Sequence, residues 1–416
     1  MKRSIEPSTI DGSIKAQPSK SMMQRAIAAA LLNEKPVKIL NPSFCSDSLA
    51  ALRVAERLGA QILRDENSVT IGGGLNPDGT ILHCGESGLC LRMFAPVAAL
   101  CDRELTLTGE CSLRSRPVTM IVRPLQELGC RVVTREGYPP ILVQGPVRGG
   151  NAEVDGSVSS QFLTGLLIAL PMAEEDSRLS VHSLASRPYI DMTLKMLEEF
   201  QVIVRHEGYE TFFVSGRQRY QGETYRVEGD WSSASFMMVA AAVGGRVRIS
   251  GLDVRSPQAD RKILEALTEA GAGLRIASDY VEIEKAELKP FRFDASDCPD
   301  LFPPLVALAC HCPGVSRIEG VERLRFKESN RATALAKEFS AIGAAIEIEN
   351  NAMKVTGGKL SGGPVSSHND HRIAMAAATA AIAAEHAVTI ENSESVAKSY
   401  PAFFDDLAAI GGRIHE

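Results

Sequence analysis

Several cations in this sequence lie where a helix is expected to begin. Lys20 belongs to Ser19-Lys20-Ser21, which opens an apolar segment, and Arg25 follows about one helical turn after Ser21. The positive end of the helix dipole disfavours cations at a helix N-terminus, so such residues indicate an anionic ligand. A solvated first turn without a ligand is the alternative, and these residues alone do not decide between the two.

A second group of charges lies within residues 322–331. Lys327 and Arg331 are four residues apart, so on a helix they would be neighbours, and like charges at this spacing are mildly destabilising. Glu328 either neutralises the pair or leaves both cations to face a bound anion. Arg372 and Lys398 add two further cations near expected turns.

Other stretches combine small, polar and basic residues. Ser159-Ser160-Gln161 leads into an apolar run, and a serine-capped helix start is also a ready anion site. Gly85-Glu86-Ser87-Gly88 supplies two glycines, which let a ligand approach the backbone closely. Residues 112–117 and 186–191 place arginine before a proline, which is typical of a helix start. Taken singly, each stretch favours a structural role: a capped helix, a loop or surface charge.

The elements that must position these residues recur along the chain. Six polar stretches each lead into an apolar segment rich in Ala, Leu or Met, and the starts are roughly 70 residues apart. The pattern predicts six buried helices, over residues 22–32, 89–101, 159–170, 234–243, 301–312 and 373–384.

A second series runs in phase with the first. Each copy is an amphipathic helix, a turn and a strand-like run, with the turn at Gly59, Gly129, Gln201, Gly271, Gly343 and Gly411. Glycine is the expected residue just after a helix, and only Gln201 departs from it. A fixed long period indicates an internally repeated architecture. Six units divide into three and three, with a crossover at about residues 226–230.

Composition narrows the function. The chain has 416 residues, a net charge of −6 and a pI of about 5.9, which argue against general binding of nucleic acid or anionic membranes. Nine cysteines form no Cys-x-x-Cys pair, and Cys310-His311-Cys312 is spaced too tightly for a usual zinc site, so reduced thiols in a cytosolic protein are expected. Neither a signal peptide nor an apolar stretch of about 20 residues is evident.

No P-loop, Gly-x-Gly-x-x-Gly or His-Glu-x-x-His motif is present. Cations at expected helix starts in an acidic protein indicate that the ligand is a small polyanion, and we expect it to be phosphorylated. The residues themselves therefore lead to a two-domain enzyme or binder for a phosphorylated metabolite.

The ordered stretches resemble the 5-enolpyruvylshikimate-3-phosphate synthase family over essentially the whole chain. They are Ser19-Lys20-Ser21 with Arg25, residues 85–92, 112–117, 159–163 and 186–191, Lys327-Glu328 with Arg331, residues 369–372, and Lys398. The resemblance implies an α/β fold of two similar globular domains, each of three βαβαββ units around buried parallel helices, the enolpyruvyl transferase inside-out barrel. The lower domain would comprise residues 1–18 and 228–416, and the upper domain residues 19–227.

The resemblance also implies the reaction. The enolpyruvyl group of phosphoenolpyruvate joins the 5-hydroxyl of shikimate 3-phosphate, and phosphate is released, in the shikimate pathway to chorismate and aromatic amino acids. It implies no metal, no cofactor, no nucleic-acid or membrane partner, a monomer in the cytoplasm, and a target of glyphosate.

Site residues carried over by motif fall into three groups. Shikimate 3-phosphate would be bound by Lys20, Ser21, Arg25, Ser159, Ser160, Gln161, Ser186, Asp300 and Lys327. Phosphoenolpyruvate would be bound by Lys20, Gly88, Arg116, Gln161, Arg331, Arg372 and Lys398. The catalytic residues would be Asp300, which takes the 5-hydroxyl proton, Glu328, which exchanges the proton at the enolpyruvyl methylene, and Lys20.

Three residues depart from the family pattern. Pro18 replaces a frequent Gly, Glu86 a frequent Asn, and Asn330 a common Asp, which puts fine affinity in doubt but not the reaction.

Two alternatives are weighed against this function. The UDP-N-acetylglucosamine enolpyruvyl transferases share the fold and use a loop cysteine five residues before Arg-Pro, which is the spacing of Cys111 to Arg116 here. The acceptor-side motifs at 159–161, 188–191 and 369–372 fit the shikimate family instead. A non-catalytic phospho-metabolite binding protein would not need both Asp300 and Glu328 among its cations.

Overall fold

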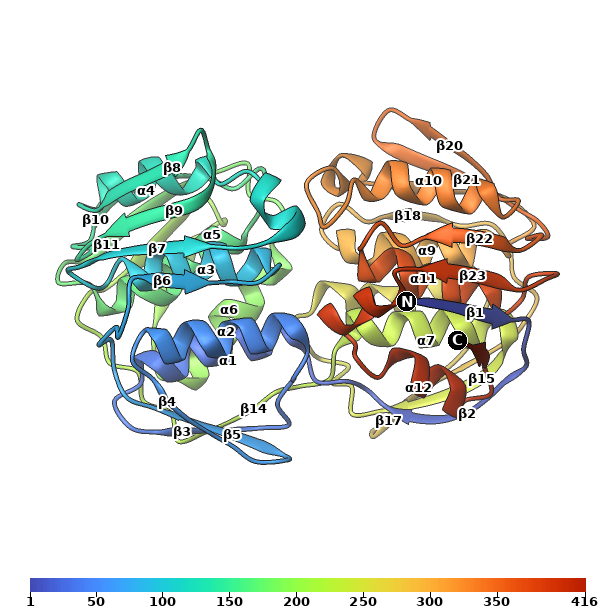
Figure 1. Cartoon of the computed structure of the whole chain (residues 1–416), viewed down its shortest axis with the longest axis horizontal. Coiled ribbons are helices and arrows are strands. Elements are labelled where there is room, and N and C mark those ends of the chain that lie inside the picture. Colours follow the sequence, from blue (N-terminus) through green and yellow to red (C-terminus); the bar gives the residue numbers. More distant parts are fainter. The chain divides into compact units, whose positions relative to one another are not determined.

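The computed structural model describes residues 1–416, which form two compact units. The continuous unit is Pro18–Glu228, and the split unit combines Met1–Gln17 with Gly229–Glu416. Each unit contains helices and three four-stranded sheets (Figure 1). The α/β class and the sixfold repetition predicted from the sequence are confirmed.

Helices and strands alternate regularly in the continuous unit. Its α-helices are α1 (Lys20–Leu32), α2 (Ser46–Arg57), α3 (Gly88–Ala98), α4 (Val122–Glu127), α5 (Gln161–Ala169) and α6 (Pro188–Glu199), and its 3-10 turns are η1 (Cys111–Ser115), η2 (Thr119–Ile121) and η3 (Leu170–Met172). Its strands are β3 (Val37–Leu40), β4 (Gln61–Arg64), β5 (Ser68–Gly72), β6 (Ile81–His83), β7 (Glu104–Thr108), β8 (Arg131–Arg135), β9 (Tyr138–Gln144), β10 (Gly150–Asp155), β11 (Ser177–His182), β12 (Val204–Glu207), β13 (Thr211–Val214) and β14 (Thr224–Arg226).

The split unit repeats this alternation. Its α-helices are α7 (Trp231–Gly244), α8 (Ile263–Glu269), α9 (Phe302–Ala309), α10 (Arg331–Ala341), α11 (His371–Ala381) and α12 (Phe403–Ala409), and its 3-10 turns are η4 (Ala259–Lys262), η5 (Pro299–Leu301), η6 (Val321–Leu324) and η7 (Ser393–Lys398). Its strands are β1 (Lys2–Glu6), β2 (Ile10–Lys15), β15 (Gly245–Ser250), β16 (Gly273–Ile276), β17 (Tyr280–Glu284), β18 (Arg292–Asp294), β19 (Gly314–Glu319), β20 (Ala345–Glu349), β21 (Ala352–Gly357), β22 (Gly363–Ser366), β23 (Val388–Glu391) and β24 (Arg413–His415).

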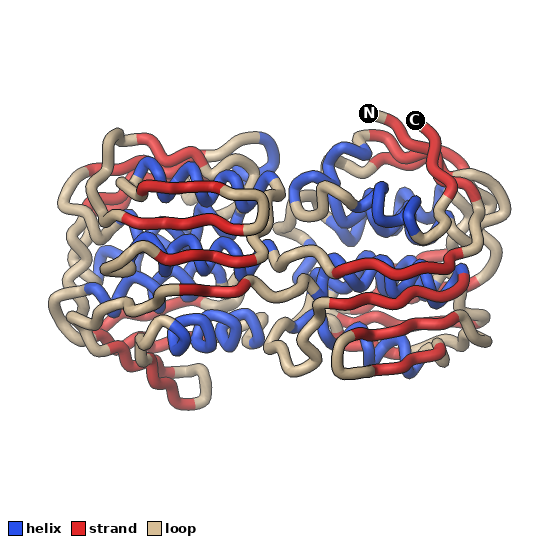
Figure 2. Tube along the Cα trace, turned by 90° about the horizontal axis from the view of Figure 1, so that it is seen from below, coloured by secondary structure: helices blue, strands red, loops and turns tan.

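All six sheets share one topology. Each contains one parallel pair followed by antiparallel partners, as in the order β10-β11-β13-β12, where β10 and β11 are parallel. In four sheets a buried helix connects the parallel strands, for example α3 between β6 and β7. The sheets lie on the outside of each unit and the buried helices inside (Figure 2).

The N-terminal segment contributes to two sheets, although residues 4–18 taken alone predict one short strand and a turn. It forms two strands that join different sheets: β1 pairs with β23 and β24, and β2 pairs in parallel with β15. The sequence pattern within residues 4–18 is too short to distinguish a turn from a second strand, because the pairing partners lie more than 200 residues away.

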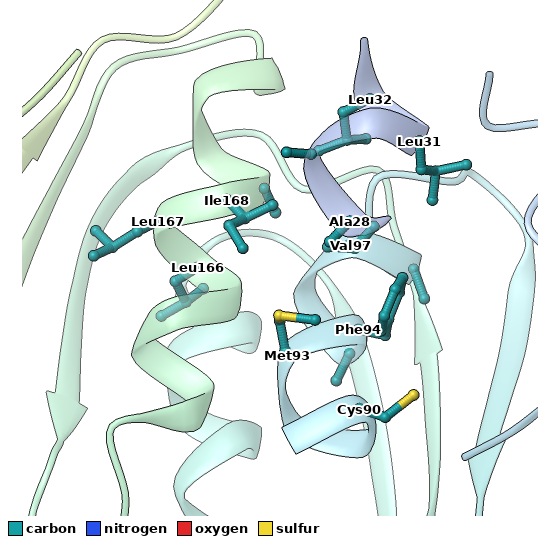
Figure 3. Close-up of a cluster of buried hydrophobic side chains, with 14 of the residues drawn as sticks. Ala28, Leu31, Leu32, Cys90, Met93, Phe94, Val97, Leu166, Leu167 and Ile168 are labelled. Carbon is teal, nitrogen blue, oxygen red and sulfur yellow. The ribbon is translucent and has the colours of Figure 1, made fainter. Parts of the chain in front are cut away.

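The core of the continuous unit lies between three of the predicted buried helices. Side chains of α1, α3 and α5 pack together there, including Leu31, Phe94 and Ile168 (Figure 3). Burying each such side chain contributes about 1.5–3 kcal/mol. A Cβ at Gly165 would lie 2.4 Å from the carbonyl oxygen of Met93, so glycine in this apolar helix permits the close approach of α5 to α3.

The glycine column keeps its backbone conformation even where glycine is missing. Gly59, Gly129, Gly271, Gly343 and Gly411 have positive φ, and so does Gln201, at 60°. Gln201 N donates to the Glu198 carbonyl as Gly129 N donates to that of Gln126, so the helix end is the same. The repeat therefore imposes a left-handed residue at this position whatever its side chain.

We expect Gln201→Gly to stabilise the protein by about 0.5–1 kcal/mol. A side chain in the left-handed region costs about 1–2 kcal/mol, and part of the gain is offset by the larger entropy of glycine in the unfolded chain. Chemical denaturation would measure the change. The matched control is Gln126→Gly inside α4, which should destabilise by about 1 kcal/mol; a loss of stability at both positions would contradict the strain argument.

Candidate functional site

Arg25 is held in the core of the continuous unit by neutral partners. Its side chain is 1% exposed, and it donates from Nε to Thr193 Oγ1 at 2.9 Å, from Nη1 to the Ser21 carbonyl at 2.8 Å and from Nη2 to the Tyr189 carbonyl at 3.0 Å. Burial lowers its pKa to about 10, so it remains charged at neutral pH. None of these partners carries a negative charge, so the arginine can attract an anion.

A second buried arginine orients Gln161 at the start of α5. Arg92, 2% exposed, donates from Nη1 to Gln161 Oε1 at 2.8 Å and from Nη2 to the Pro117 carbonyl at 2.9 Å. With its amide oxygen engaged, Gln161 has its NH2 group to offer a ligand. Ser159 Oγ accepts from Gln161 N at 3.2 Å, and Ser160 is the N-cap residue without a side-chain cap bond.

Gly88 and Arg116 are in direct contact. Gly88 is the first residue of α3, whose N-cap is Ser87. A Cβ at Gly88 would lie 2.6 Å from Arg116 Nη1 and 2.8 Å from its Cζ, closer than any real contact allows. The missing side chain therefore leaves the space that the Arg116 guanidinium occupies.

The remaining predicted residues of this unit are Lys20, Ser21 and Ser186. Lys20 Nζ lies 3.0 Å from Asp47 Oδ2, and both side chains are largely buried. Ser21 follows Lys20 in the first turn of α1, and Ser186, with φ of 59°, precedes α6. Lys20 is thus paired with a carboxylate, whereas the partners of Arg25 are neutral.

In the split unit, carboxylates surround Arg331, the first residue of α10. Its side chain is 1% exposed, and it donates from Nε to Asp370 Oδ2 at 2.8 Å and from Nη1 to Asp300 Oδ1 at 2.7 Å, with Glu328 bonded to Nη2. Burial opposes the charge, but Asp370, Glu328 and Asp300 raise the pKa of Arg331 above its usual value. The guanidinium is therefore permanently charged.

Asp300 is shared by three cations. Its Oδ1 lies 2.7 Å from Arg331 Nη1 and 3.5 Å from Lys327 Nζ, and its Oδ2 accepts from Arg372 Nη2 at 3.0 Å. Burial lowers the pKa of Lys327 to about 8 although Asp300 opposes the shift, so Lys327 is mostly charged at neutral pH and loses its proton as the pH rises through 8.

Two further cations lie around the start of α11. Arg372 also donates from Nη1 to Ser232 Oγ at 2.6 Å and to the Asp300 carbonyl at 3.2 Å. Lys398 Nζ donates to the Asn369 carbonyl at 2.6 Å. Asn369 and its neighbour His368 both have positive φ, which turns the chain into α11.

Asp300, Lys327, Glu328, Arg331 and Arg372 thus form one cluster in the split unit. Anions can bind to the cations, and the carboxylates can accept or donate protons, which are the two requirements of acid–base chemistry on a phosphorylated substrate. No group of three or more His, Cys, Asp or Glu residues is arranged to hold a metal ion.

Local structure corrects two predictions. Lys327 does not lie on a helix, because α10 begins only at Arg331, after the N-cap Asn330. No helix begins at Pro117 either: Arg116 is extended, the 3-10 turn η2 begins at Thr119, and α4 starts at Val122. The predicted helix at Pro188 is confirmed.

Several residues that hold the site were not assigned a role from the sequence. They are Asp47, Arg92, Thr164, Thr193 and Asp370. Thr164 and Thr193 could have been suspected, since each is a polar residue in an otherwise apolar helix face. Arg92 and Asp370 lay inside motifs already singled out, but their partners are distant in sequence.

The chain matches known proteins over its whole length. A family model of EPSP synthase (3-phosphoshikimate 1-carboxyvinyltransferase) matches residues 5–407. A 3-phosphoshikimate 1-carboxyvinyltransferase of Methanocorpusculum labreanum is 38% identical over 100% of both chains. One of Aeropyrum pernix is 38% identical over 99% of this chain and 96% of the relative.

Solved structures also resemble this chain over its whole length. The EPSP synthase of Acinetobacter baumannii superimposes with a TM-score of 0.84 at 26% identity, covering 100% of both chains. The enolpyruvyl transferase NikO of Streptomyces tendae gives 0.79 at 16% identity, covering 100% of this chain and 98% of the other, which shows the fold alone. None of the helices reaches the length and apolarity that a membrane span requires.

We expect Gly88→Ala to weaken the binding of phosphoenolpyruvate by at least ~10-fold. Phosphoenolpyruvate is the ligand that the resemblance assigns to Arg116. The added methyl must displace the Arg116 guanidinium, and a misplaced charged hydrogen bond costs about 1.5–3 kcal/mol. KM values for both substrates would measure it, and the KM for shikimate 3-phosphate should change far less. Gly74→Ala is the control, since a Cβ there meets nothing within 4 Å. An equal loss for both substrates would make Gly88 a merely structural turn.

Proposed function

The chain belongs to the EPSP synthase family, and from this premise we propose how its charged residues divide the work of the reaction. The protein is an enzyme that transfers the enolpyruvyl group of phosphoenolpyruvate to shikimate 3-phosphate in the shikimate pathway. The observation that carries the assignment of roles is the sharing of Asp300 by Lys327, Arg331 and Arg372.

The proposed binding groups follow the motifs. Shikimate 3-phosphate is bound by Lys20, Ser21, Arg25, Ser159, Ser160, Gln161, Ser186, Asp300 and Lys327, and phosphoenolpyruvate by Lys20, Gly88, Arg116, Gln161, Arg331, Arg372 and Lys398. The neutral partners of Arg25 support its role, because they orient the guanidinium without cancelling its charge. The contact of Gly88 with Arg116 supports assigning both to one ligand.

Two carboxylates carry the proposed proton transfers, with Lys20 as a third catalytic group. The 5-hydroxyl oxygen bonds to C2 of phosphoenolpyruvate while its proton passes to Asp300, and Glu328 gives a proton to C3. Phosphate then leaves C2 and takes the proton held by Asp300, and a C3 proton returns to Glu328, which restores the double bond. Substrate anions compete with both carboxylates for the cations, which makes protonation of Asp300 and Glu328 more favourable.

Phosphate release tests the function directly. The enzyme should release phosphate from phosphoenolpyruvate with shikimate 3-phosphate as acceptor and not with UDP-N-acetylglucosamine. Release with the nucleotide sugar alone would favour the related cell-wall transferase. Binding of both substrates without release would favour a non-catalytic phospho-metabolite receptor.

We also propose that the enzyme acts as a monomer in the cytoplasm. All residues assigned to substrates lie on one chain, and the nine cysteines are unpaired, as is usual in a reducing compartment. Light scattering after size exclusion should give a mass near 44.7 kDa; twice that mass would overturn the monomer.

Glu328→Gln should lower kcat by at least ~10², the low end for a lost general acid or base. Glutamine keeps the size and the acceptor for Arg331 Nη2 but has no exchangeable acid. Steady-state kinetics would show both KM values changing much less than kcat. Glu322→Gln, an exposed change in the preceding turn η6, is the control for loss of one negative charge. Near-normal kcat with a large rise in KM would instead assign Glu328 to positioning Arg331.

Cys111→Ser should leave turnover within about twofold of the unchanged enzyme. Cys111 is exposed in η1, and the proposed site needs no thiol. Initial rates with shikimate 3-phosphate as acceptor would measure this. Loss of turnover in Cys111→Ser, with the fold intact by circular dichroism, would mean that the loop cysteine has the role it has in the UDP-N-acetylglucosamine enzymes.

A further inference from the structure

Glu338 is a buried carboxylate that the proposed mechanism does not use. It lies in α10, two turns after Arg331, and is 5% exposed. Its Oε2 accepts from Ser366 N at 2.8 Å, and its Oε1 lies 2.7 Å from His368 Nε2. Burial opposes ionisation, but the Ser366 N–H, His368 and Lys337 hold the pKa of Glu338 below its usual value. The carboxylate is therefore ionised at neutral pH and binds the segment that leads into α11.

This segment contains two successive residues in the left-handed region. His368 has a φ of 51° and Asn369 a φ of 56°. Residues other than glycine seldom adopt this conformation, and it persists only where surrounding contacts impose it. Glu338 supplies such a contact at the imidazole, and Ser366 Oγ supplies another by accepting from His368 N at 3.1 Å. Glu338 and Ser366 thus hold His368 by both its side chain and its backbone.

The same turn is held from its other side by Ser367, which is fully buried. Its hydroxyl donates to the Asn392 carbonyl at 3.0 Å and accepts from Asn369 N at 3.1 Å. It also accepts from Ser395 Oγ at 3.4 Å. Ser395 belongs to η7, the 3-10 turn that ends at Lys398. The left-handed turn and the segment that carries Lys398 are therefore fixed to each other.

The turn makes a direct contact with the Lys398 ammonium. The Asn369 carbonyl accepts from Lys398 Nζ at 2.6 Å. The direction of a backbone carbonyl is set by the φ and ψ of its residue, so the left-handed conformation of Asn369 determines where Nζ is held. A carbonyl oxygen orients the ammonium without cancelling its charge.

We propose that Glu338 is a positioning residue for Lys398, on which it acts through the left-handed turn at His368 and Asn369. Without the carboxylate, His368 can leave the left-handed region, the Asn369 carbonyl turns with it, and Nζ loses its place. The inference rests on the proposed function in one respect, the assignment of Lys398 to phosphoenolpyruvate.

The kinetic test uses the full-length enzyme, with each substrate varied while the other is saturating. Glu338→Ala should raise the KM for phosphoenolpyruvate by about 10-fold, the low end for losing a hydrogen bond to a charged group. Changes in kcat and in the KM for shikimate 3-phosphate should stay below about threefold. Glu338→Gln keeps an acceptor for Ser366 N, so it should raise the KM for phosphoenolpyruvate by only about threefold.

Two further variants separate the contacts of this carboxylate. Lys337→Gln removes an exposed ammonium that lies 3.3 Å from Glu338 Oε1, and it should leave both KM values unchanged. His368→Asn places at the turn a residue that tolerates the left-handed region but is shorter than histidine. It should raise the KM for phosphoenolpyruvate by about threefold, because the contact with Glu338 is lost. An unchanged KM in His368→Asn would contradict a role for that contact.

A double-mutant cycle with Lys398→Ala decides whether Glu338 acts through the ammonium. In that background Glu338→Ala should not raise the KM for phosphoenolpyruvate further. Additive effects would overturn the proposal, and so would an equal rise in both KM values. A merely structural role would lower the free energy of unfolding in chemical denaturation without separating the two KM values. If Glu338→Ala does not fold, Glu338→Gln and His368→Asn are put through the same cycle.

Failure of the unchanged enzyme to release phosphate would instead overturn the proposed function. Calorimetric titration of phosphoenolpyruvate into the four proteins of the cycle would then test the inference by itself. Non-additive losses of affinity in Glu338→Ala and Lys398→Ala would support it, and additive losses, or no binding to the unchanged protein, would overturn it.

Discussion

A buried, permanently charged arginine is the constraint on which the split unit depends. Moving an ion out of water costs several kcal/mol even after relaxation, and Arg331 is 1% exposed. Asp370, itself fully buried, offsets that cost while it also accepts from Ser329 Oγ and Arg372 N. One carboxylate therefore ties the first residue of α10 to the first turn of α11, and the positions of Arg331 and Arg372 follow from it.

The continuous unit places two buried arginines in a different way. Arg25 and Arg92 are held by hydroxyl, amide and carbonyl oxygens, which supply hydrogen bonds without a net charge. Such dipoles satisfy a guanidinium and leave its charge to act on a ligand. The split unit instead balances its cations with carboxylates, which can take up protons. The first arrangement suits binding of a phosphate, and the second suits proton transfer beside bound anions.

The sequence predicted what depends on local pattern. The six buried helices follow from apolar periodicity, and the turns after the surface helices follow from glycine. At position 201 the residue is glutamine, so the turn there was predicted from the period of the repeat alone. The family resemblance identified the cations of the site, because their motifs occur in the same order along the chain. No local pattern could identify the residues that bond to these cations: Thr193 lies 168 residues from Arg25, and Asp370 lies 39 residues from Arg331. The helix expected to carry Lys327 was wrong because the segment before Asn330 bends so that Lys327 contacts Asp300.

The partners of Asp300 bear on how this carboxylate, as the proposed base, could bind cations and also accept a proton. Lys327, Arg331 and Arg372 all stabilise its ionised form, and a carboxylate so stabilised is a weak base. Phosphate and carboxylate groups of the substrates are themselves strong acceptors for these three cations. Each contact they take from Asp300 removes part of that stabilisation, so binding of the substrates raises the tendency of Asp300 to accept a proton. The same competition applies to Glu328 at Arg331, and it links proton transfer to occupancy of the site by both anions.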